Sequence, residues 1–322
     1  MTPKNIITTI KERQPNIKSI VYVGCGASQA DLYPAKYFLE ENSKDIRVSL
    51  YTANEFNYAT PKAVDSSCIV ITASLGGTTP ETVEATSKAK KLGAHVITLT
   101  HIENSPITKD ADYVLVHGFE KNYAAKLEKM TLAVQLAVEI LYQFEGYDNY
   151  KEMINGFDKI YNLIEESVST VLPEAKKFAN SYKDDKLIYL MGSGATAKVA
   201  YSTSLCLLME MQWVNSGNFH NGEFFHGPFE IVDKNVPFLL FMNDGKTRPM
   251  DSRALTFLQR FDAKITVIDA KDFGISSVIS PKVVDYFNPM LISGVMRVYA
   301  EQLAIARSHP LTKRRYMWKL EY

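Results

Sequence analysis

Two stretches of the chain, about half its length apart, have nearly the same sequence. The segment SIVYVGCGAS (19–28) resembles IYLMGSGAT (188–196), and Gly24 corresponds to Gly192 at an offset of 192 − 24 = 168. The same offset, within one residue, relates further pairs along the chain: Gly77 and Gly245, Thr79 and Thr247, and the apolar runs 94–100 and 263–270. Four matches in one register indicate an internal duplication.

Each copy alternates apolar runs rich in β-branched residues with turns and amphipathic segments. A second apolar run lies at 68–73 in the first copy and at 237–242 in the second. Strands that alternate with helices predict a parallel sheet covered on both faces. We therefore predict an α/β fold with two tandem, doubly wound parallel-sheet subdomains. They should span 15–145 and 184–306, with a helical linker at 146–183 and a C-terminal tail at 307–322.

The balance of charge excludes some partners. Lys+Arg and Asp+Glu both number 36, so no overall field favours nucleic acid or a membrane surface. No apolar stretch is long enough to span a bilayer, and the first residues do not resemble a signal peptide. Three cysteines without paired spacing, Cys25, Cys68 and Cys206, indicate buried thiols in a reducing compartment. We expect a cytoplasmic protein.

The turn ASLGGTTPET (73–82) has the composition of an anion site. It combines the hydroxyls of Ser74, Thr78 and Thr79 with the flexible Gly76, and Pro80 fits the first position of a helix capped by Thr79. A helix N-terminus carries unpaired N–H groups and partial positive charge. With no lysine in the turn, a monophosphate suits it better than a triphosphate with magnesium. The alternative is an ordinary capped helix.

The other turns are weaker candidates for phosphate. The Gly-rich turn around Gly26 lacks the third small residue of a dinucleotide motif, so nucleotide binding is disfavoured. In the second copy, the turn MNDGKT (242–247) places Asp244 among the donors, where a carboxylate would repel phosphate. We therefore assign phosphate binding to the first copy.

Glu210 is out of place in its surroundings. It lies between Met209 and Met211 at the end of an apolar helical run, whereas its counterpart at the 168 offset, Asn42, lies in a polar segment. A glutamate at a helix C-terminus opposes the helix dipole, and desolvation beside methionines makes a carboxylate a stronger base. These properties suit a general base. A glutamate that extends to solvent is the alternative.

The segment FHNGEFFHGPFE (219–230) contains His220, Glu223 and His226 at intervals of three residues. The helical zinc motif requires histidines four apart, so we disfavour a metal site. Two glycines and a proline prevent a long helix, and at best Asn221 caps a single turn that ends at Gly227. An acid–base element and a hydrophobic segment with polar interruptions both remain open from these residues alone.

Three motifs, CGAS (25–28), SLGGTTPET (74–82) and GEFFHGPFE (222–230), resemble the sugar isomerase (SIS) family. By pattern the chain is most similar to the fructoselysine 6-phosphate deglycases, and then to the isomerase half of glutamine–fructose-6-phosphate aminotransferase. The deglycase likeness also rests on NDGKTRPMDSRA (243–254) and RRYMWKLEY (314–322). The duplicated architecture covers nearly the whole chain.

The resemblance implies roles for particular residues. The sugar phosphate should be held by the two turns of the first copy, through Gly26, Ser28, Ser74, Gly76, Thr78 and Thr79. In the isomerase half the general base lies sixteen residues before the histidine of the HGP motif, and 226 − 16 = 210 is Glu210. His226 should open the sugar ring and deliver a proton, and Glu223 should orient it or bind substrate. The isomerases' C-terminal lysine falls nearest Trp318, one place from Lys319.

The activity implied is cleavage of a fructosamine 6-phosphate, such as fructoselysine 6-phosphate, into glucose 6-phosphate and a free amine, by proton transfers that need no cofactor and no metal. The resemblance also implies a homodimer or larger homo-oligomer, because in relatives the HGP histidine can come from a neighbouring subunit. An aldose–ketose or amino-sugar phosphate isomerase and a non-catalytic sugar-phosphate-binding protein are the alternatives.

Overall fold

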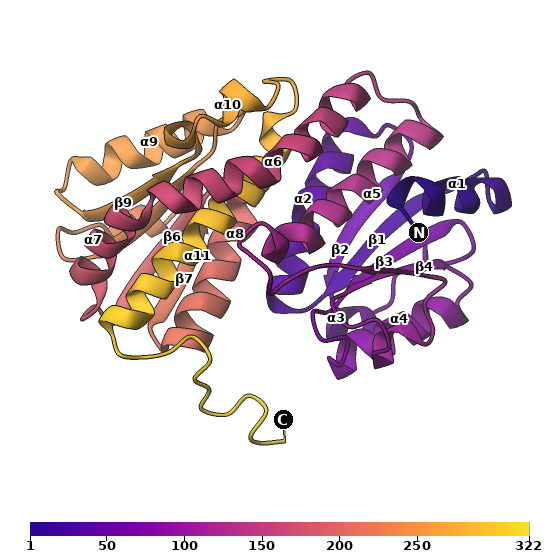
Figure 1. Ribbon diagram of the computed structural model, residues 1–322, viewed down its shortest axis with the longest axis horizontal. Coiled ribbons are helices and arrows are strands. Elements are labelled where there is room, and N and C mark those ends of the chain that lie inside the picture. The colour runs from indigo at the N-terminus through magenta and orange to yellow at the C-terminus, as the bar shows by residue number, and fades with distance from the viewer. Residues whose placement is uncertain (322) are drawn as a thin grey trace. The chain divides into compact units, whose positions relative to one another are not determined.

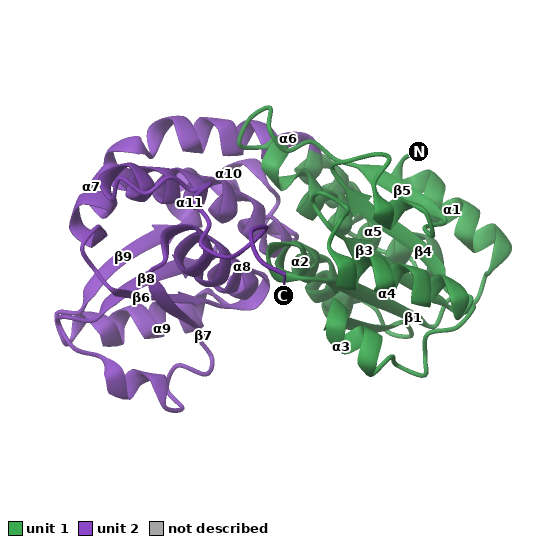
Figure 2. Ribbon diagram, turned by 90° about the horizontal axis from the view of Figure 1, so that it is seen from below, with its two compact units in different colours: residues 1–157 green, residues 158–322 purple. Residues whose placement is uncertain are grey.

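The computed structural model describes residues 1–321. The chain forms two compact units, residues 1–157 and residues 158–322, which are coloured separately in Figure 2. Each unit is built around its own parallel sheet with helices packed against it (Figure 1). The predicted α/β fold with tandem doubly wound units is therefore confirmed.

The first unit contains a five-stranded sheet in the order β2-β1-β3-β4-β5, and all neighbouring strands are parallel. The strands are β1 (Ser19–Gly24), β2 (Arg47–Thr52), β3 (Cys68–Ala73), β4 (His95–Thr100) and β5 (Tyr113–Val116). Strands β1 and β3 are buried along their whole length. This burial explains why their sequences are continuous apolar runs rather than alternating ones.

Helices cover both faces of this sheet, with α1, α2 and α5 on one side and α3 and α4 on the other (Figure 1). Their bounds are α1 (Pro3–Arg13), α2 (Gly26–Asn42), α3 (Ala53–Tyr58), α4 (Pro80–Lys91) and α5 (Glu128–Phe144). Helix α6 (Tyr150–Thr170) leads from the first unit into the second. No helix within residues 1–321 is both long and apolar enough to cross a membrane.

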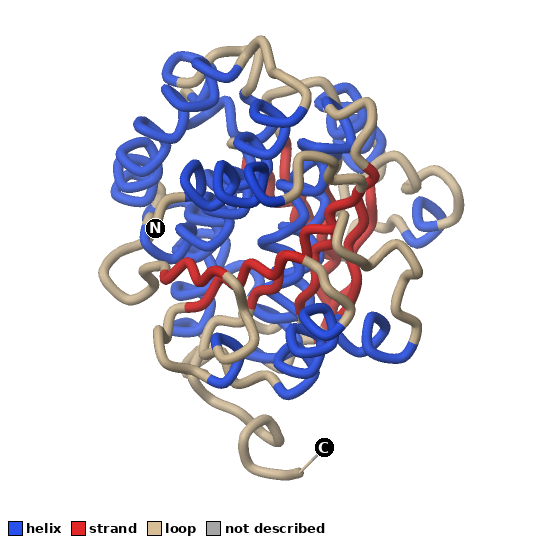
Figure 3. The backbone as a smooth tube through the Cα atoms, turned by 90° about the vertical axis from the view of Figure 1, so that its right-hand side faces the viewer, coloured by secondary structure: helices blue, strands red, loops and turns tan. Residues whose placement is uncertain are grey.

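The second unit repeats this arrangement with a four-stranded sheet in the order β7-β6-β8-β9. Its strands are β6 (Leu187–Gly192), β7 (Asn215–His220), β8 (Pro237–Met242) and β9 (Lys264–Asp269). Its helices are α7 (Leu172–Tyr182), α8 (Ala197–Ser202), α9 (Arg248–Gln259), α10 (Ile275–Val278) and α11 (Asn288–Ala306). Figure 3 distinguishes the strands from the helices that flank them.

The duplication extends to backbone geometry. The order β2-β1-β3-β4 in the first sheet corresponds to β7-β6-β8-β9 in the second. The equivalent glycines after the first strand of each copy have the same left-handed conformation, with φ of 52° at Gly26 and 53° at Gly194. A side chain at Gly194 would also collide with the Thr247 hydroxyl, 2.5 Å from an ideal Cβ. Glycine is therefore required at this turn in the second copy.

The cysteines differ from expectation in one respect. Cys68 and Cys206 are buried as expected, whereas Cys25 is half-buried at the start of α2. None of the three forms a disulfide in the described part of the chain. Burial raises the pKa of the Cys68 thiol to about 11, which keeps it protonated and unreactive at neutral pH.

Asp251, in the first turn of α9, joins the ends of three strands in the second unit. Its carboxylate accepts hydrogen bonds from the hydroxyl of Ser193 after β6 (2.5 Å), from the amide of Asn221 after β7 (2.6 Å) and from the amide of Asn243 after β8 (2.6 Å). The backbone N–H of Asn243 donates a further bond of 3.0 Å. The Asp251 carboxylate therefore accepts hydrogen bonds from the donors at this edge of the second sheet.

Two sequence predictions for this edge are wrong. Asp244 was expected to place its carboxylate among the turn's donors, but it turns toward Lys271 and Ser276, and Asp251 takes that place. Asn221 was expected to cap a helical turn, but its Nδ2 donates to Asp251 and its Oδ1 accepts no hydrogen bond within residues 1–321. For Asn221 the partner is a carboxylate 30 residues away in sequence.

The Asp251 cluster makes a prediction about stability. Burial raises the pKa of Asp251 from 3.8 to about 6. Because this acid has a higher pKa in the folded state, its stabilising contribution is complete below about pH 4 and is lost as pH rises through about 6. The free energy of unfolding of the wild type, minus that of Asp251→Asn, should therefore fall by roughly 3 kcal/mol over this range.

Denaturant titrations at several pH values measure this difference. Asp233→Asn, at an exposed aspartate of the same unit, is the matched control. A difference for Asp251→Asn that stays flat between pH 4 and pH 6 would contradict the burial of an ionisable carboxylate at the strand ends.

Candidate functional site

Two turns of the first unit lie next to each other because their strands are adjacent. In the register of β1 with β3, Gly24 faces Ala73, so the turns that follow both strands start side by side. The hydroxyl of Thr82 in α4 donates to Cys25 Sγ at 3.8 Å, which links the two turns. In open sheets with this strand order, ligands bind where the order reverses, and here that point lies between β1 and β3.

The turn between β3 and α4 is held tightly by its own residues. The hydroxyls of Ser74 and Thr79 are 3.0 Å apart and share a hydrogen bond. Gly77 has a φ of 65°, and an ideal Cβ there would lie 2.0 Å from Ser105 Oγ. Gly76 and Thr78 are exposed at the surface of the turn. The turn therefore presents hydroxyls and a helix N-terminus, which is the arrangement expected of an anion site.

The role of Thr79 as a cap is only partly as predicted. Thr79 occupies the position before α4, and Pro80 is the first helical residue. The Thr79 side chain, however, makes no capping hydrogen bond to the helix. Its hydroxyl is engaged by Ser74 instead, so the prediction of a side-chain cap is wrong.

Lys129 belongs to this site and was missed from the sequence. It lies in α5 and is buried, with 5% of its surface exposed. Its ammonium donates to Ser28 Oγ at 2.9 Å and lies 3.1 Å from Asp31 Oδ2. Burial raises the pKa of Asp31, and the nearby Lys129 counteracts part of that rise. A buried cation therefore stands beside the Ser28 hydroxyl at the first turn.

The segment 219–230 of the second unit is anchored by its aromatic residues. Phe224 is fully buried in the core between the sheet and α9. Its ring makes edge contacts with Phe225 and Phe257, at centroid distances of 5.2 and 6.0 Å. The backbone N–H of His226 donates to Glu223 O at 2.9 Å, which closes a single tight turn. The phenylalanines therefore form a scaffold that fixes the polar residues between them.

The two histidines of this segment have different surroundings. His220 is exposed, and its Nδ1 accepts the Gly222 N–H at 3.0 Å. Partial desolvation of the ring lowers the pKa of His220, and the negative charge of Glu223 opposes this effect. The His226 side chain is exposed and has no hydrogen bond or ion pair within residues 1–321. The same residues contain no group of three or more His, Cys, Asp or Glu side chains placed to hold a metal.

Glu210 ends a π-helix, η4 (Thr203–Glu210), that continues directly from α8. A π-helix closes hydrogen bonds one residue further along than an α-helix, and such segments are frequent at functional sites. The change of pitch turns Glu210 away from the direction that regular α-helical periodicity would give it. Its Oε1 lies 2.7 Å from the Arg314 guanidinium, and its side chain is 22% exposed.

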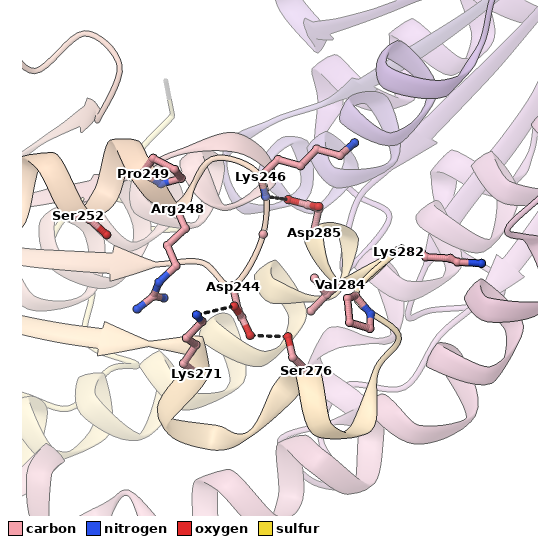
Figure 4. Close-up of a pocket in the computed structure, with 12 residues that line it drawn as sticks. Asp244, Lys246, Arg248, Pro249, Ser252, Lys271, Ser276, Lys282, Val284 and Asp285 are labelled. Carbon is pink, nitrogen blue, oxygen red and sulfur yellow. Dashed lines mark hydrogen bonds and ion pairs between the residues drawn. The ribbon is translucent and has the colours of Figure 1, made fainter.

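A pocket of about 540 Å³ lies at the ends of β8 and β9 in the second unit (Figure 4). Its lining includes four cationic and two acidic side chains: Lys246, Arg248, Lys271, Lys282, Asp244 and Asp285. Arg248 forks onto Asp269 at 2.7 and 2.6 Å, and Lys271 Nζ lies 3.5 Å from Asp244 Oδ1. Neither Glu210 nor His226 lines this pocket. Because the carboxylates of Asp244 and Asp285 in its lining would repel a phosphate, we do not place the phosphate here.

The predicted residues thus gather at one sheet edge in the first unit and on two elements in the second. Ser28, Ser74 and Thr79 stand at the adjacent ends of β1 and β3, with Lys129 added by α5. Glu210 lies on η4 and His226 on the aromatic turn, and no hydrogen bond joins their side chains in the described residues.

Comparison with known proteins extends this picture. The SIS domain model matches residues 16–143. Fructosamine deglycase FrlB of Bacillus subtilis is 39% identical over 306 residues, covering 95% of this chain and 93% of that protein. Fructoselysine 6-phosphate deglycase of Escherichia coli K12 is 26% identical, covering 94% and 86%.

Solved structures agree with this likeness. A structure from Salmonella typhimurium LT2, of phosphosugar isomerase type, has a TM-score of 0.95 and 41% identity, and covers 100% of this chain and 96% of that one. The C-terminal domain of glucosamine-fructose-6-phosphate aminotransferase from Francisella tularensis, at 19% identity, shares the fold with a TM-score of 0.79 over 96% and 94% of the two chains. The chain therefore belongs to the SIS domain family, the family of fructosamine deglycase FrlB.

Proposed function

We propose that this protein is a deglycase that cleaves a fructosamine 6-phosphate, with fructoselysine 6-phosphate as its substrate, into glucose 6-phosphate and a free amine. The observation that carries the proposal is the likeness to fructosamine deglycase FrlB along 95% of the chain. Two features of the structure support it: the hydroxyl-rich turns of the first unit, and a carboxylate and an exposed imidazole in the second.

The reaction consists of proton transfers followed by hydrolysis. The substrate carries its carbonyl at C2, next to the acidic hydrogens of C1. Glu210 removes one C1 proton and gives an enaminol, and protonation at C2 then gives a glucosyl imine. Water adds to the imine carbon, and the amine leaves to yield the aldehyde of glucose 6-phosphate. His226 opens the sugar ring and supplies a proton.

The first unit binds the phosphate in this proposal. Hydrogen bonds to the phosphate come from the hydroxyls of Ser28, Ser74 and Thr79. The turns add donors from the backbone and side chains at Gly26, Gly76 and Thr78, and Lys129 adds a positive charge. A charge-assisted hydrogen bond is worth more than a neutral one, so a monophosphate gains most from this donor set. Glu223, exposed beside His220, contacts the amine part of the substrate.

Two further properties complete the proposal. The protein acts in the cytoplasm, which the three cysteines support because none of them is in a disulfide within the described residues. It acts as a homodimer or larger homo-oligomer. The exposed imidazole of His226, without a side-chain partner in residues 1–321, is available to a substrate held with a neighbouring subunit.

A panel of phosphorylated sugars tests the activity. Fructoselysine 6-phosphate should give glucose 6-phosphate, detected by coupling to glucose-6-phosphate dehydrogenase, and the asparagine and glucoselysine analogues define the amine preference. Fructose 6-phosphate, with phosphoglucose isomerase left out of the assay, should give no product. Turnover of fructose 6-phosphate alone would favour an isomerase, and binding of every sugar without turnover would favour a sensor.

If these turns bind the phosphate, removing their hydroxyls should weaken substrate binding only. Ser74→Ala combined with Thr79→Val should raise KM, because each lost hydrogen bond to a charged group contributes roughly 1.5–3 kcal/mol. Inorganic phosphate should compete with substrate in the parent and much less in the variant. Thr247→Val, the counterpart of Thr79 in the second unit, is the matched control and should leave KM unchanged. An unchanged KM in the double variant would place the phosphate elsewhere.

The two histidines allow a paired test of the acid–base assignment. His226→Asn should lower kcat roughly 10²–10⁴-fold, because an amide forms hydrogen bonds but does not deliver a proton near neutral pH. His220→Asn, the same change six residues earlier, should be nearly harmless, and a strong chelator should leave activity intact. Loss of activity on chelation that zinc or manganese restores would contradict the assignment and favour a metal site at His220, Glu223 and His226.

A further inference from the structure

The chain after α11 folds back onto the residues that follow Glu210. The amide of Gln212 donates to His309 O at 2.7 Å, and the ring of Trp213 meets the imidazole of His309 edge-on at a centroid distance of 4.5 Å. The guanidinium of Arg315 lies over the Trp213 ring at 4.4 Å. Contacts of His309 and Arg315 therefore attach this segment, residues 307–321, to the second unit close in sequence to the candidate general base.

Within this segment, Arg314 is held from several directions. Its side chain is buried, with 8% exposed, and its Nη1 donates to Leu311 O at 2.6 Å. Its guanidinium faces the ring of Trp318 at 5.3 Å, and the ammonium of Lys319 donates to the Arg314 carbonyl at 2.7 Å. The other terminal nitrogen, Nη2, forms an ion pair with Glu210 Oε1 at 2.7 Å. Contacts other than the one with Glu210 therefore hold both the backbone and the side chain of Arg314.

The contact engages one carboxylate oxygen and leaves the other available. Arg314 is bound at Oε1 of Glu210, and no hydrogen bond or ion pair reaches Oε2 within the described residues. A general base must hold one oxygen toward the carbon acid, and a shift of about 1 Å from productive geometry can reduce a rate about 10²-fold. A permanently charged, planar guanidinium that is itself immobilised restricts the rotation of such a carboxylate.

We propose that Arg314 is a positioning residue for the reaction: it fixes Glu210 through Oε1 so that Oε2 faces the C1 hydrogen of the substrate. This inference rests on the proposed function, since it assigns the proton abstraction to Glu210. It also gives residues 307–321 a part in the reaction, because Leu311, Trp318 and Lys319 hold Arg314 in place. Lys319 acts here through the Arg314 backbone.

The chain offers a matched pair of arginines for the test. Arg314→Met keeps an apolar stem against Trp318 but removes the contact with Glu210, whereas Arg315→Met removes a neighbouring charge that lies on Trp213. Arg314→Met should lower kcat roughly 10- to 100-fold with KM within about twofold of the parent. The isotope effect on kcat with C1-deuterated substrate should rise, because proton abstraction becomes slower than the other steps. Arg315→Met should leave both unchanged.

Arg314→Lys provides the second arm. Lysine restores the charge without the planar fork, so it cannot keep the contacts with Leu311 and Glu210 together, and its kcat should lie between those of the parent and Arg314→Met. Thermal unfolding of each variant shows whether the fold is kept. If Arg314→Met does not fold, Arg314→Lys serves as the test. A reduced kcat with a raised isotope effect in that variant supports the proposal.

Several results would overturn the inference. The inference fails if Arg314→Met keeps the parental kcat or the parental isotope effect. It also fails if Arg315→Met loses as much kcat as Arg314→Met. Where Arg314→Met is unfolded, it fails if Arg314→Lys keeps the parental kcat and isotope effect. Glu210→Gln separates this inference from the function on which it rests. If that variant loses turnover while Arg314→Met keeps it, only the positioning role fails. If Glu210→Gln is fully active, the assigned base is wrong.

Discussion

Parallel strands that end at one edge of a sheet leave backbone and side-chain donors there, and each unit must satisfy them. In the second unit the carboxylate of Asp251 accepts from residues that follow β6, β7 and β8, so the edge is closed by the chain itself. In the first unit the corresponding edge carries the hydroxyls of Ser28 and Ser74 with the ammonium of Lys129. The donors at this edge are therefore satisfied by a carboxylate of the chain itself in the second unit and, in our proposal, by the substrate's phosphate in the first.

The fold was predictable because its signals are local and repeated. Alternating apolar runs and turns predict parallel sheets, and the offset between Gly26 and Gly194 predicts two copies whose turns share one backbone conformation. Segment 219–230 has the hydrophobic character that its phenylalanines predict, since Phe224 lies in the core of the second unit.

The finer parts of the candidate site depend on contacts between distant residues. Lys129 is 101 residues from Ser28, and Arg314 is 314 − 210 = 104 residues from Glu210. A charged residue at the start of the apolar run of α5 was the available signal for Lys129, because a lysine is rarely buried without a partner. The π-helical turn that carries Glu210 has no comparable signature, since its sequence fits an α-helix equally well. Asp251 was overlooked because Asp244 lies nearer the turn in sequence.

The central claim is that the enzyme removes a proton from C1 of an aminoketose phosphate, and the fate of the two C1 hydrogens tests it most directly. Fructoselysine 6-phosphate with deuterium at both C1 positions should yield glucose 6-phosphate that keeps one deuterium at C1, as counted by mass spectrometry and NMR. Direct hydrolysis of the C1–N bond would leave both deuterons on C1 of a ketose product. Recovery of fructose 6-phosphate with both deuterons would contradict the account.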